Sequence, residues 1–126
     1  MNLYHDLILD HYKHPRNFGE LENPDAIGRE SNATCGDLIE MQLQESRVKS
    51  RVKKIADIKW RGIGCAISTA SASLLSEKIK NMPLSEIQKI TDQNVVELLG
   101  GEITSVRIKC ATLPLKALQN TINKLK

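Results

Sequence analysis

Three cysteines, Cys35, Cys65 and Cys110, are the residues of this chain most able to do chemistry. They lie 30 and 45 residues apart and form no Cys-x-x-Cys pair, which argues against a zinc ribbon or a redox dithiol. An odd number of cysteines without an export signal also argues against a disulfide framework. The thiols are therefore inert, reactive or metal-binding, and a site that uses all three must be assembled by the fold.

Each cysteine lies where a predicted strand or helix begins or ends. Cys35 precedes Gly36 and Asp37 in a turn before a strand, so its thiol and the Asp37 carboxylate can point to one side. Cys65 lies between a strand and a helix, where free N–H groups and the helix dipole favour a thiolate. Cys110 falls in the first turn of another helix. Ligand or nucleophile roles are open to all three, although an isolated free cysteine is often a buried core residue.

Two other chemistries have weaker support in the sequence. Cysteine-dependent hydrolysis needs a histidine base beside the nucleophile, and His5, His11 and His14 all lie in or just after the first predicted helix. We expect His5 and His11 on the surface or rim of that helix. The Gly62-x-Gly64 sequence lacks the third glycine of a dinucleotide-binding fingerprint, so we expect no phosphate site.

Hydrophobic periodicity predicts the elements that position these residues. Apolar side chains at three- and four-residue steps predict a helix at about 2–13, which Pro15 ends. Residues 39–43 alternate apolar and polar side chains, which predicts a half-buried strand, and the same period continues on a second strand at 58–62. The polar set on the first of these strands is Glu40, Gln42 and Gln44.

The second half of the chain is predicted to be helical. Small side chains dominate the first half of the helix expected from Ala66 to Lys80, which allows it to lie close to a sheet. The remaining helices are expected at 85–90, at 92–99 with Gly100-Gly101 as its C-cap, and in 108–125, as one turn around Cys110 followed by a terminal helix from Pro114. Strands followed by helices predict an α+β fold, a small antiparallel three-stranded sheet with helices packed on one face, in a single domain of residues 1–126.

Composition excludes several function classes. No apolar run approaches the roughly 18 residues of a membrane span, and Asp6 and Asp10 interrupt the only candidate signal peptide, so we expect a cytoplasmic protein without a membrane partner. A net charge of +3 and 3% aromatic residues argue against a dedicated nucleic-acid binder. Arg47, Lys49, Arg51 and Lys53 alternate along one connection and predict a solvated hairpin tip, with a basic nucleic-acid-binding stripe as the alternative.

Four motifs resemble those of the IscU/NifU-type iron–sulfur cluster assembly scaffolds. Three of them surround the cysteines, and the fourth follows the first predicted helix. The motifs occur in the family's order, and the resemblance covers nearly the whole chain. They are His14-Pro-Arg-Asn17, Asn32-Ala-Thr-Cys-Gly-Asp37, Gly62-Ile-Gly-Cys-Ala-Ile-Ser-Thr-Ala-Ser-Ala-Ser73 and Arg107-Ile-Lys-Cys-Ala-Thr-Leu113.

The motif variants distinguish branches of this family. Lys109 stands where IscU has a histidine before the last cysteine, which is similar to the SufU branch. SufU proteins usually carry an insertion before the last motif, and the 45-residue gap leaves no room for it. Residues 104–107 stand where IscU has the Leu-Pro-Pro-Val-Lys segment that engages an Hsp70 chaperone, so that partnership is not expected. Pro114 is a further departure from the family pattern.

The resemblance implies that Cys35, Asp37, Cys65 and Cys110 converge at one end of the fold. Such a set can hold a transient [2Fe–2S] cluster or a tetrahedral Zn²⁺ ion. Asp37 is a more exchangeable ligand than a fourth cysteine, which favours transfer over storage. Lys109 is expected to hold the neighbouring thiolate electrostatically, with a solvated surface lysine as the alternative.

The resemblance also implies a function without small-molecule turnover. A pyridoxal-phosphate cysteine desulfurase delivers persulfide sulfur to Cys35, Cys65 or Cys110, an iron donor supplies iron, and the cluster passes to apo-protein acceptors. The alternative is a SufU-like zinc-dependent sulfur acceptor that stimulates the desulfurase. A third interpretation of the sequence is a structural zinc protein or a basic binding module.

Overall fold

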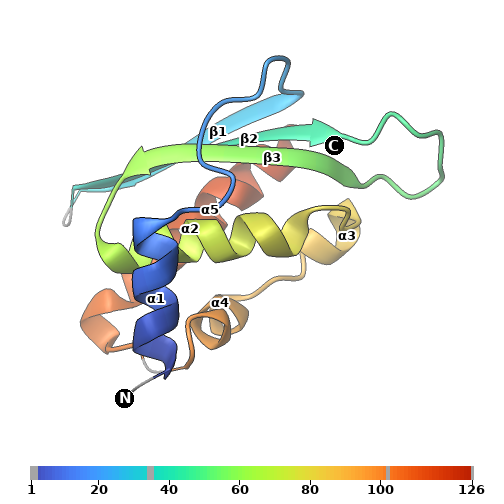
Figure 1. The fold of residues 1–126 in the computed structure, drawn as a ribbon. Coiled ribbons are helices and arrows are strands. Elements are labelled where there is room, and N and C mark those ends of the chain that lie inside the picture. Colours follow the sequence, from blue (N-terminus) through green and yellow to red (C-terminus); the bar gives the residue numbers. More distant parts are fainter. Residues whose placement is uncertain (1–2, 34–35, 102, 126) are drawn as a thin grey trace.

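A sheet lies over a layer of helices in the computed structural model, which describes residues 3–33, 36–101 and 103–125 (Figure 1). Both sheet hairpins come from the first half of the chain, and the helices that cover them come mostly from the second half. In chain order the elements are α1 (Leu3–Lys13), β1 (Ala26–Asn32), β2 (Asp37–Glu45), β3 (Ile55–Ile63), α2 (Ala66–Ile79), α3 (Leu84–Ile87), α4 (Asp92–Leu98), the 3₁₀ turn η1 (Ser105–Arg107) and α5 (Ile108–Asn123).

The sheet has the order β1-β2-β3, and both strand pairs are antiparallel, which confirms the predicted fold class. Ile39, Met41 and Leu43 on β2 are fully buried against the helices, as their alternation predicts. β1 has no clear signal in the sequence, because Ala26–Asn32 contains only two apolar side chains, a glycine and four polar residues. Pairing with β2 and packing against α5 make this segment a strand.

The outer face of the sheet is partly covered, which corrects one expectation. Glu40 and Gln42 on β2 are buried rather than solvated. Arg29 on β1 and Arg61 on β3 both form ion pairs with the Glu40 carboxylate. The backbone N–H of Leu21 donates to Oε1 of Gln42 at 2.8 Å, so the segment before β1 lies over this face.

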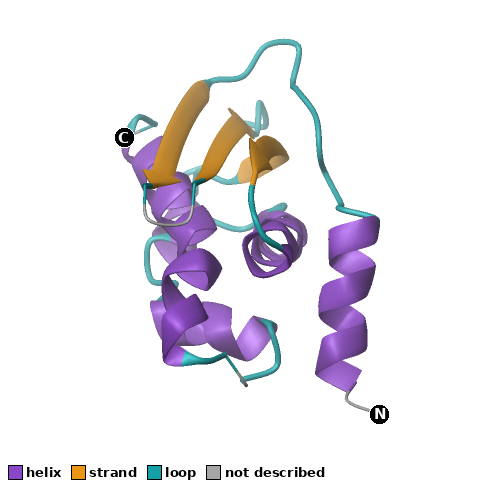
Figure 2. Cartoon of the chain, turned by 90° about the vertical axis from the view of Figure 1, so that its left-hand side faces the viewer, coloured by secondary structure: helices purple, strands orange, loops and turns teal. Residues whose placement is uncertain are grey.

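The small side chains of α2 allow this helix to pack closely against its neighbours. α2 contacts α1 and α5 and also lies against β3, and Figure 2 shows α1 standing to one side of the other helices. His11 is only 4% exposed at the α1–α2 contact, which corrects the expectation that it lies on the helix surface, whereas His5 is exposed as expected. Nδ1 of His11 lies 2.7 Å from the Ser73 hydroxyl. The serines of α2 therefore allow α1 to pack closely and also provide buried hydrogen-bonding partners.

The C-terminal segment differs from its expected form, because α5 runs unbroken from Ile108 to Asn123 with Pro114 inside it. A proline has no N–H to donate to the carbonyl four residues earlier, here that of Cys110. The next carbonyl, that of Ala111, accepts a hydrogen bond of 2.6 Å from the Ser71 hydroxyl of α2. Tertiary packing between α2 and α5 thus holds a helix that proline alone would shorten.

The remaining helix boundaries agree with the sequence signals. Thr91 and Asn94 form a reciprocal capping box at the start of α4, and Gly100 and Gly101, with φ of 103° and 82°, close its end as predicted. α3 is shorter than expected and covers Leu84–Ile87 only. Within the described residues, we find no helix with the length and apolarity that crossing a membrane requires.

Candidate metal centre

Asp37, Cys65 and Cys110 come together at one end of the sheet. One carboxylate oxygen and the two sulfur atoms all lie within 4.8 Å of one another. Asp37 begins β2, Cys65 lies directly before α2, and Cys110 lies in the first turn of α5. The structure therefore joins three of the four ligands that the sequence predicts, and the fourth, Cys35, falls outside the described residues.

Asp37 has the surroundings of a ligand rather than of a surface acid. It is 4% exposed, and its Oδ2 atom has no hydrogen-bond partner among the described residues. Gly36 precedes it with φ of 73°, a left-handed conformation that glycine adopts without strain. A buried carboxylate oxygen without a donor is costly unless a cation or another partner compensates it. This donor set therefore fits a metal ion or cluster.

The spacing of the donor atoms also fits a single metal. Thiolates about 2.3 Å from one tetrahedral zinc ion lie roughly 3.8 Å apart. The donor atoms of Asp37, Cys65 and Cys110 are separated by at most 4.8 Å, so each separation exceeds this value by no more than about an ångström. Such a ligand set would give a bound zinc ion or iron–sulfur cluster one hard oxygen ligand among soft sulfur ligands, and the bound metal would keep the thiols deprotonated.

Cys65 is set up as a thiolate by the helix that follows it. Burial raises the pKa of the Cys65 thiol, but the N–H and hydroxyl of Ser68, the Cys110 thiol and the N–H of Ile67 favour the charged form more strongly. The pKa is therefore lowered from its ordinary value. This is the effect expected for a cysteine at a helix N-terminus.

A close backbone approach at Gly64 makes this arrangement possible. A Cβ atom on Gly64 would collide with the hydroxyl of Ser68 and would lie 3.5 Å from the carboxyl carbon of Asp37. Ser68, which the sequence marks only as one of several small helix residues, is thus a functional neighbour of the site. The signal that could have found it is its position three residues after Cys65, where a helix N-cap is usually contacted.

Access to the two described thiols is unequal. Cys110 is buried, whereas Cys65 is partly exposed and borders a hollow of about 430 Å³. Besides Cys65, the hollow is lined by Ala66, Ile67, Ile103, Thr104 and Arg107. A reactant that enters from this side meets Cys65 first, with the guanidinium-bearing Arg107 at the wall.

Lys109 does not line the hollow beside Cys65. It is exposed on α5 and lines a separate hollow of about 240 Å³ with residues 30–33, Leu113 and Lys116. Its predicted action on a thiolate stays a prediction. The histidines also stay apart, since within the described part of the chain the Asp37, Cys65 and Cys110 cluster contains no histidine. A Cys-His hydrolase site therefore has no support.

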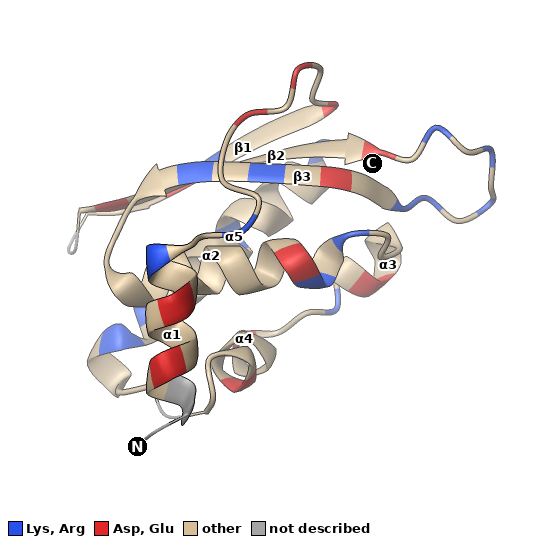
Figure 3. Ribbon diagram, in the orientation of Figure 1, with Lys and Arg blue, Asp and Glu red and all other residues tan. Residues whose placement is uncertain are grey.

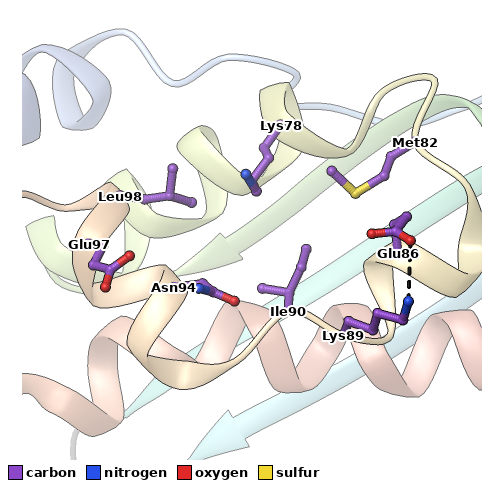
Figure 4. A pocket seen from close by; sticks show the side chains of 8 residues that line it. All are labelled: Lys78, Met82, Glu86, Lys89, Ile90, Asn94, Glu97 and Leu98. Carbon is purple, nitrogen blue, oxygen red and sulfur yellow. Dashed lines mark hydrogen bonds and ion pairs between the residues drawn. The ribbon is translucent and has the colours of Figure 1, made fainter.

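Two further hollows are lined by neither Cys65 nor Cys110. A groove of about 400 Å³ separates α2, α3 and α4 and mixes opposite charges, including a Glu86–Lys89 ion pair, with apolar side chains (Figure 4). Another hollow, of about 580 Å³, lies on the outer face of the sheet next to the metal centre. Phe18, Leu38 and Ile63 are exposed there, and Leu38 and Ile63 are paired residues of β2 and β3.

The class of protein follows from fold, site and sequence similarity together. The chain matches the NifU-like N terminal domain over residues 3–126 and belongs to this family. The match confirms the resemblance that the four motifs predict.

Individual relatives agree with the family assignment. An iron–sulfur cluster assembly scaffold protein IscU of Archaeoglobus fulgidus is 35% identical over 120 residues, which cover 95% of this chain and 74% of that protein. The zinc-dependent sulfurtransferase SufU of Bacillus subtilis is also 35% identical, over 139 residues that cover 97% and 90% of the two chains. Because that match is longer than the 126-residue chain, SufU contains residues that this chain lacks.

Solved structures share the fold. A putative iron–sulfur cluster assembly scaffold protein for the SUF system from Fervidobacterium islandicum has a TM-score of 0.77 and 25% identity, with 93% of this chain and 94% of that chain covered. A NifU-like N-terminal domain from Brucella abortus has a TM-score of 0.76 at 18% identity, covering 97% and 93% of the two chains, and therefore shows similarity of fold alone.

Proposed function

We propose that this chain is an iron–sulfur cluster assembly scaffold. It accepts persulfide sulfur from a cysteine desulfurase, holds a nascent [2Fe–2S] cluster on Cys35, Asp37, Cys65 and Cys110, and passes the cluster to apo-proteins. The observation that carries the proposal is the convergence of Asp37, Cys65 and Cys110 at one end of the sheet. Membership of the NifU-like N terminal domain family supports it.

Sulfur acceptance requires a thiolate that a partner can reach. In this step a cysteine thiolate attacks the outer sulfur of the desulfurase persulfide, the S–S bond of that persulfide breaks, and the desulfurase thiolate leaves. The transfer itself needs no external electrons, and the later reduction of each sulfane sulfur to sulfide takes two electrons from a cellular reductant. Cys65 has a lowered pKa and borders the 430 Å³ hollow, so of the two described thiols it is the one prepared for this attack.

The cargo is iron and sulfide rather than a resident cofactor. Three thiolates and one carboxylate supply enough ligands for assembly, and the carboxylate of Asp37 exchanges more readily than a fourth thiolate. Bound iron–sulfur clusters are normally held by four cysteines. A site with one oxygen ligand therefore supports transient holding and release.

Apolar side chains around the metal centre offer a contact surface for the desulfurase. Ile63 and Val106 are 75% and 80% exposed, and Leu38 is also exposed beside Asp37. Ile63→Glu should lower the stimulation of a cysteine desulfurase severalfold, because it places a charge in a surface that must be desolvated on binding. Turnover measured with increasing chain concentration checks this, with Ile27→Glu as the control, because Ile27 is exposed on β1 and pairs with Gln42, away from Asp37. Unchanged stimulation by Ile63→Glu would place the contact elsewhere.

A second function is favoured by particular residues. Arg107-Ile108-Lys109-Cys110 has the lysine of the SufU branch, and the zinc-dependent sulfurtransferase of Bacillus subtilis is 35% identical. In this alternative, Cys35, Asp37, Cys65 and Cys110 hold zinc and one thiol accepts sulfur for the desulfurase. When bound, zinc keeps its ligand thiols deprotonated at neutral pH.

One experiment separates the two functions. The chain is purified without oxygen and without chelators, and zinc, iron and acid-labile sulfide are measured. Iron and sulfide in near-equal amounts support the scaffold, whereas one equivalent of zinc without sulfide supports the sulfur acceptor. Asp37→Ala should lower the metal content in either case, and substitution of the exposed Asp6 of α1 by Ala should not. Equal metal content in wild type and Asp37→Ala would overturn both assignments of the site.

A further inference from the structure

The connection between β2 and β3 carries the positive charge of the chain. Residues 46–54 include five basic side chains and no acidic one. The whole chain has 18 basic and 15 acidic residues and a formal net charge of +3. Without residues 46–54, it has 13 basic and 15 acidic residues and a formal net charge of −2. Figure 3 shows these residues as a basic loop that projects beyond the end of the sheet. We call residues 46–54 the β2–β3 loop.

Most of these charges are free to meet a partner. Arg47 forms an ion pair of 2.9 Å with Asp25 at the base of the loop. Residues 47–54 are all exposed. Among the residues that the structure describes, no acidic side chain pairs with the other four cations, which are Lys49, Arg51, Lys53 and Lys54.

The base of the loop is held by backbone hydrogen bonds. The N–H of Ser46 donates to the carbonyl of Lys54 at 2.9 Å, which closes the two ends of the loop. The N–H of Leu84 donates to the carbonyl of Lys53 at 2.9 Å, which ties the loop to the start of α3. A loop that is fixed at its base loses less conformational entropy when it binds.

Two valines indicate the class of partner. Val48 is 77% and Val52 is 47% exposed, and both lie among the basic residues. Phosphate groups of nucleic acids would meet the cations but would leave the valines without an apolar contact. The loop also contains no aromatic side chain on which a base could stack. A protein surface with carboxylates around an apolar depression would pair with the cations of the loop and would bury its two valines.

We propose that the β2–β3 loop is a docking element for such an acidic protein surface. It lies at the opposite end of the β2–β3 hairpin from Asp37 and Cys65, about 30 Å away along nine-residue strands. A partner held there leaves the metal centre open to a second protein. The proposal goes beyond the scaffold function and uses none of its ligands.

Two peptides of equal length and charge test the docking surface. One alternates Glu with Leu and the other alternates Glu with Ser, and each is titrated into the isotope-labelled chain at physiological ionic strength. We expect the Glu-Leu peptide to shift the amide signals of residues 46–54. Its affinity should be at least about fivefold higher than that of the Glu-Ser peptide. Lys49→Gln with Arg51→Gln should weaken binding about tenfold.

Matched variants separate docking from net charge. Lys13→Gln with Lys78→Gln removes the same charge from exposed positions elsewhere and should leave the affinity within about twofold. Val48→Ser with Val52→Ser should bring the Glu-Leu peptide to the affinity of the Glu-Ser peptide. All substituted side chains are exposed, and the amide spectra of the free variants report whether the fold is kept.

Four outcomes would overturn the proposal. Equal affinity for both peptides, or equal loss in the control variant, would show attraction by net charge alone. Tighter binding of duplex DNA than of the Glu-Leu peptide through residues 46–54 would assign the loop to nucleic acid. Tighter binding of phosphatidylserine vesicles through the same residues would assign it to a membrane surface.

Discussion

Asp37 lies buried beside two thiols, with one carboxylate oxygen that has no hydrogen-bond partner in the described part of the chain. A carboxylate in that position is a weaker ligand for soft metals than a thiolate. No described residue donates to this oxygen, so a cation is the partner that we expect to compensate its charge. At the residue scale, we therefore expect this single oxygen ligand to favour release of a bound metal or cluster over storage.

Asp37→Cys should therefore turn a releasing site into a retaining one. We expect loss of zinc to a competing chelator to slow by about tenfold or more, because a fourth thiolate replaces the oxygen ligand. Stopped-flow release with a chromogenic chelator measures this. Asp6→Cys adds the same thiol at an exposed position of α1, and this variant should release zinc at the wild-type rate. Equal rates for Asp37→Cys and wild type would contradict a ligand role for Asp37.

Cys65 should react as a thiolate at lower pH than a free cysteine. Burial raises its pKa, but the donors of Ser68, the Cys110 thiol and the N–H of Ile67 together lower it from the ordinary value. Ser68→Ala removes the hydroxyl donor and should raise the pKa, so alkylation at neutral pH should slow severalfold. The pH midpoint of iodoacetamide alkylation at Cys65, followed by peptide mass in chelator-treated protein, checks this. Ser85→Ala, at an exposed position of α3, should leave the midpoint unchanged. An unchanged midpoint in Ser68→Ala would mean that the Ser68 hydroxyl does not lower the pKa of Cys65.

At the scale of elements, α2 is the helix that ties the site to the rest of the fold. Its serines bond outward to three different segments. Ser71 donates to α5, Ser73 contacts His11 of α1 and the N–H of Arg16, and Ser76 donates to the carbonyl of Arg16. The motif at residues 14–17 is thus held by α2, and Nε1 of Trp60 also donates to the Arg16 carbonyl. This motif therefore supports the fold behind the site rather than the site itself.

His11 makes the α1–α2 contact sensitive to pH. Burial and the nearby Arg16 charge lower the pKa of His11, and Glu77 and Asp10 offset this only in part. The unfolded chain, with a histidine pKa of about 6.5, therefore takes up a proton before the folded chain does. The contribution of neutral His11 to the free energy of unfolding is therefore fully present above that pH and is lost as the pH falls below it.

Urea unfolding between pH 7.5 and 5.5 measures this dependence. We expect the wild-type midpoint to fall with pH and His11→Gln to flatten the decrease, because glutamine does not titrate. His5→Gln removes an exposed histidine of the same helix and should keep the wild-type slope. The same slope in His11→Gln and wild type would assign the pH dependence to other groups.

For the whole molecule, the metal centre joins elements that are distant in sequence. Its described candidate ligands come from β2, from the residue before α2 and from α5. The unfolded chain does not hold these groups together, so a bound metal should stabilise the folded state. We therefore expect metal loading to raise the global stability of this fold.

Zinc should raise the free energy of unfolding of the whole chain. At a free zinc concentration 100 times the Kd, we expect an increase of about 2.7 kcal/mol, seen as a higher urea midpoint. Asp37→Ala with Cys110→Ser should lose most of the increase, whereas Asp57→Ala on β3 should keep it. An equal zinc effect in the ligand variant would mean that the ion binds elsewhere.

Local signals in the sequence determine a large part of this protein. Alternation of apolar residues defines β2 and β3, three- and four-residue steps define α1, and the glycines at 100–101 end α4. Cysteines at the ends of elements, together with the motif order, identify the family and the ligand types. These features depend on residues that are near one another in the chain, so periodicity and capping chemistry reveal them.

Tertiary structure decides what depends on distant partners. β1 becomes a strand by pairing with β2, α5 continues through Pro114 while α2 packs beside it, and Glu40 and His11 become buried because other segments cover them. The approach of Asp37 to Cys65 and Cys110 also belongs here, since it requires the sheet and two helices to meet. Each of these outcomes depends on contacts between residues far apart in sequence, for which local periodicity carries no information.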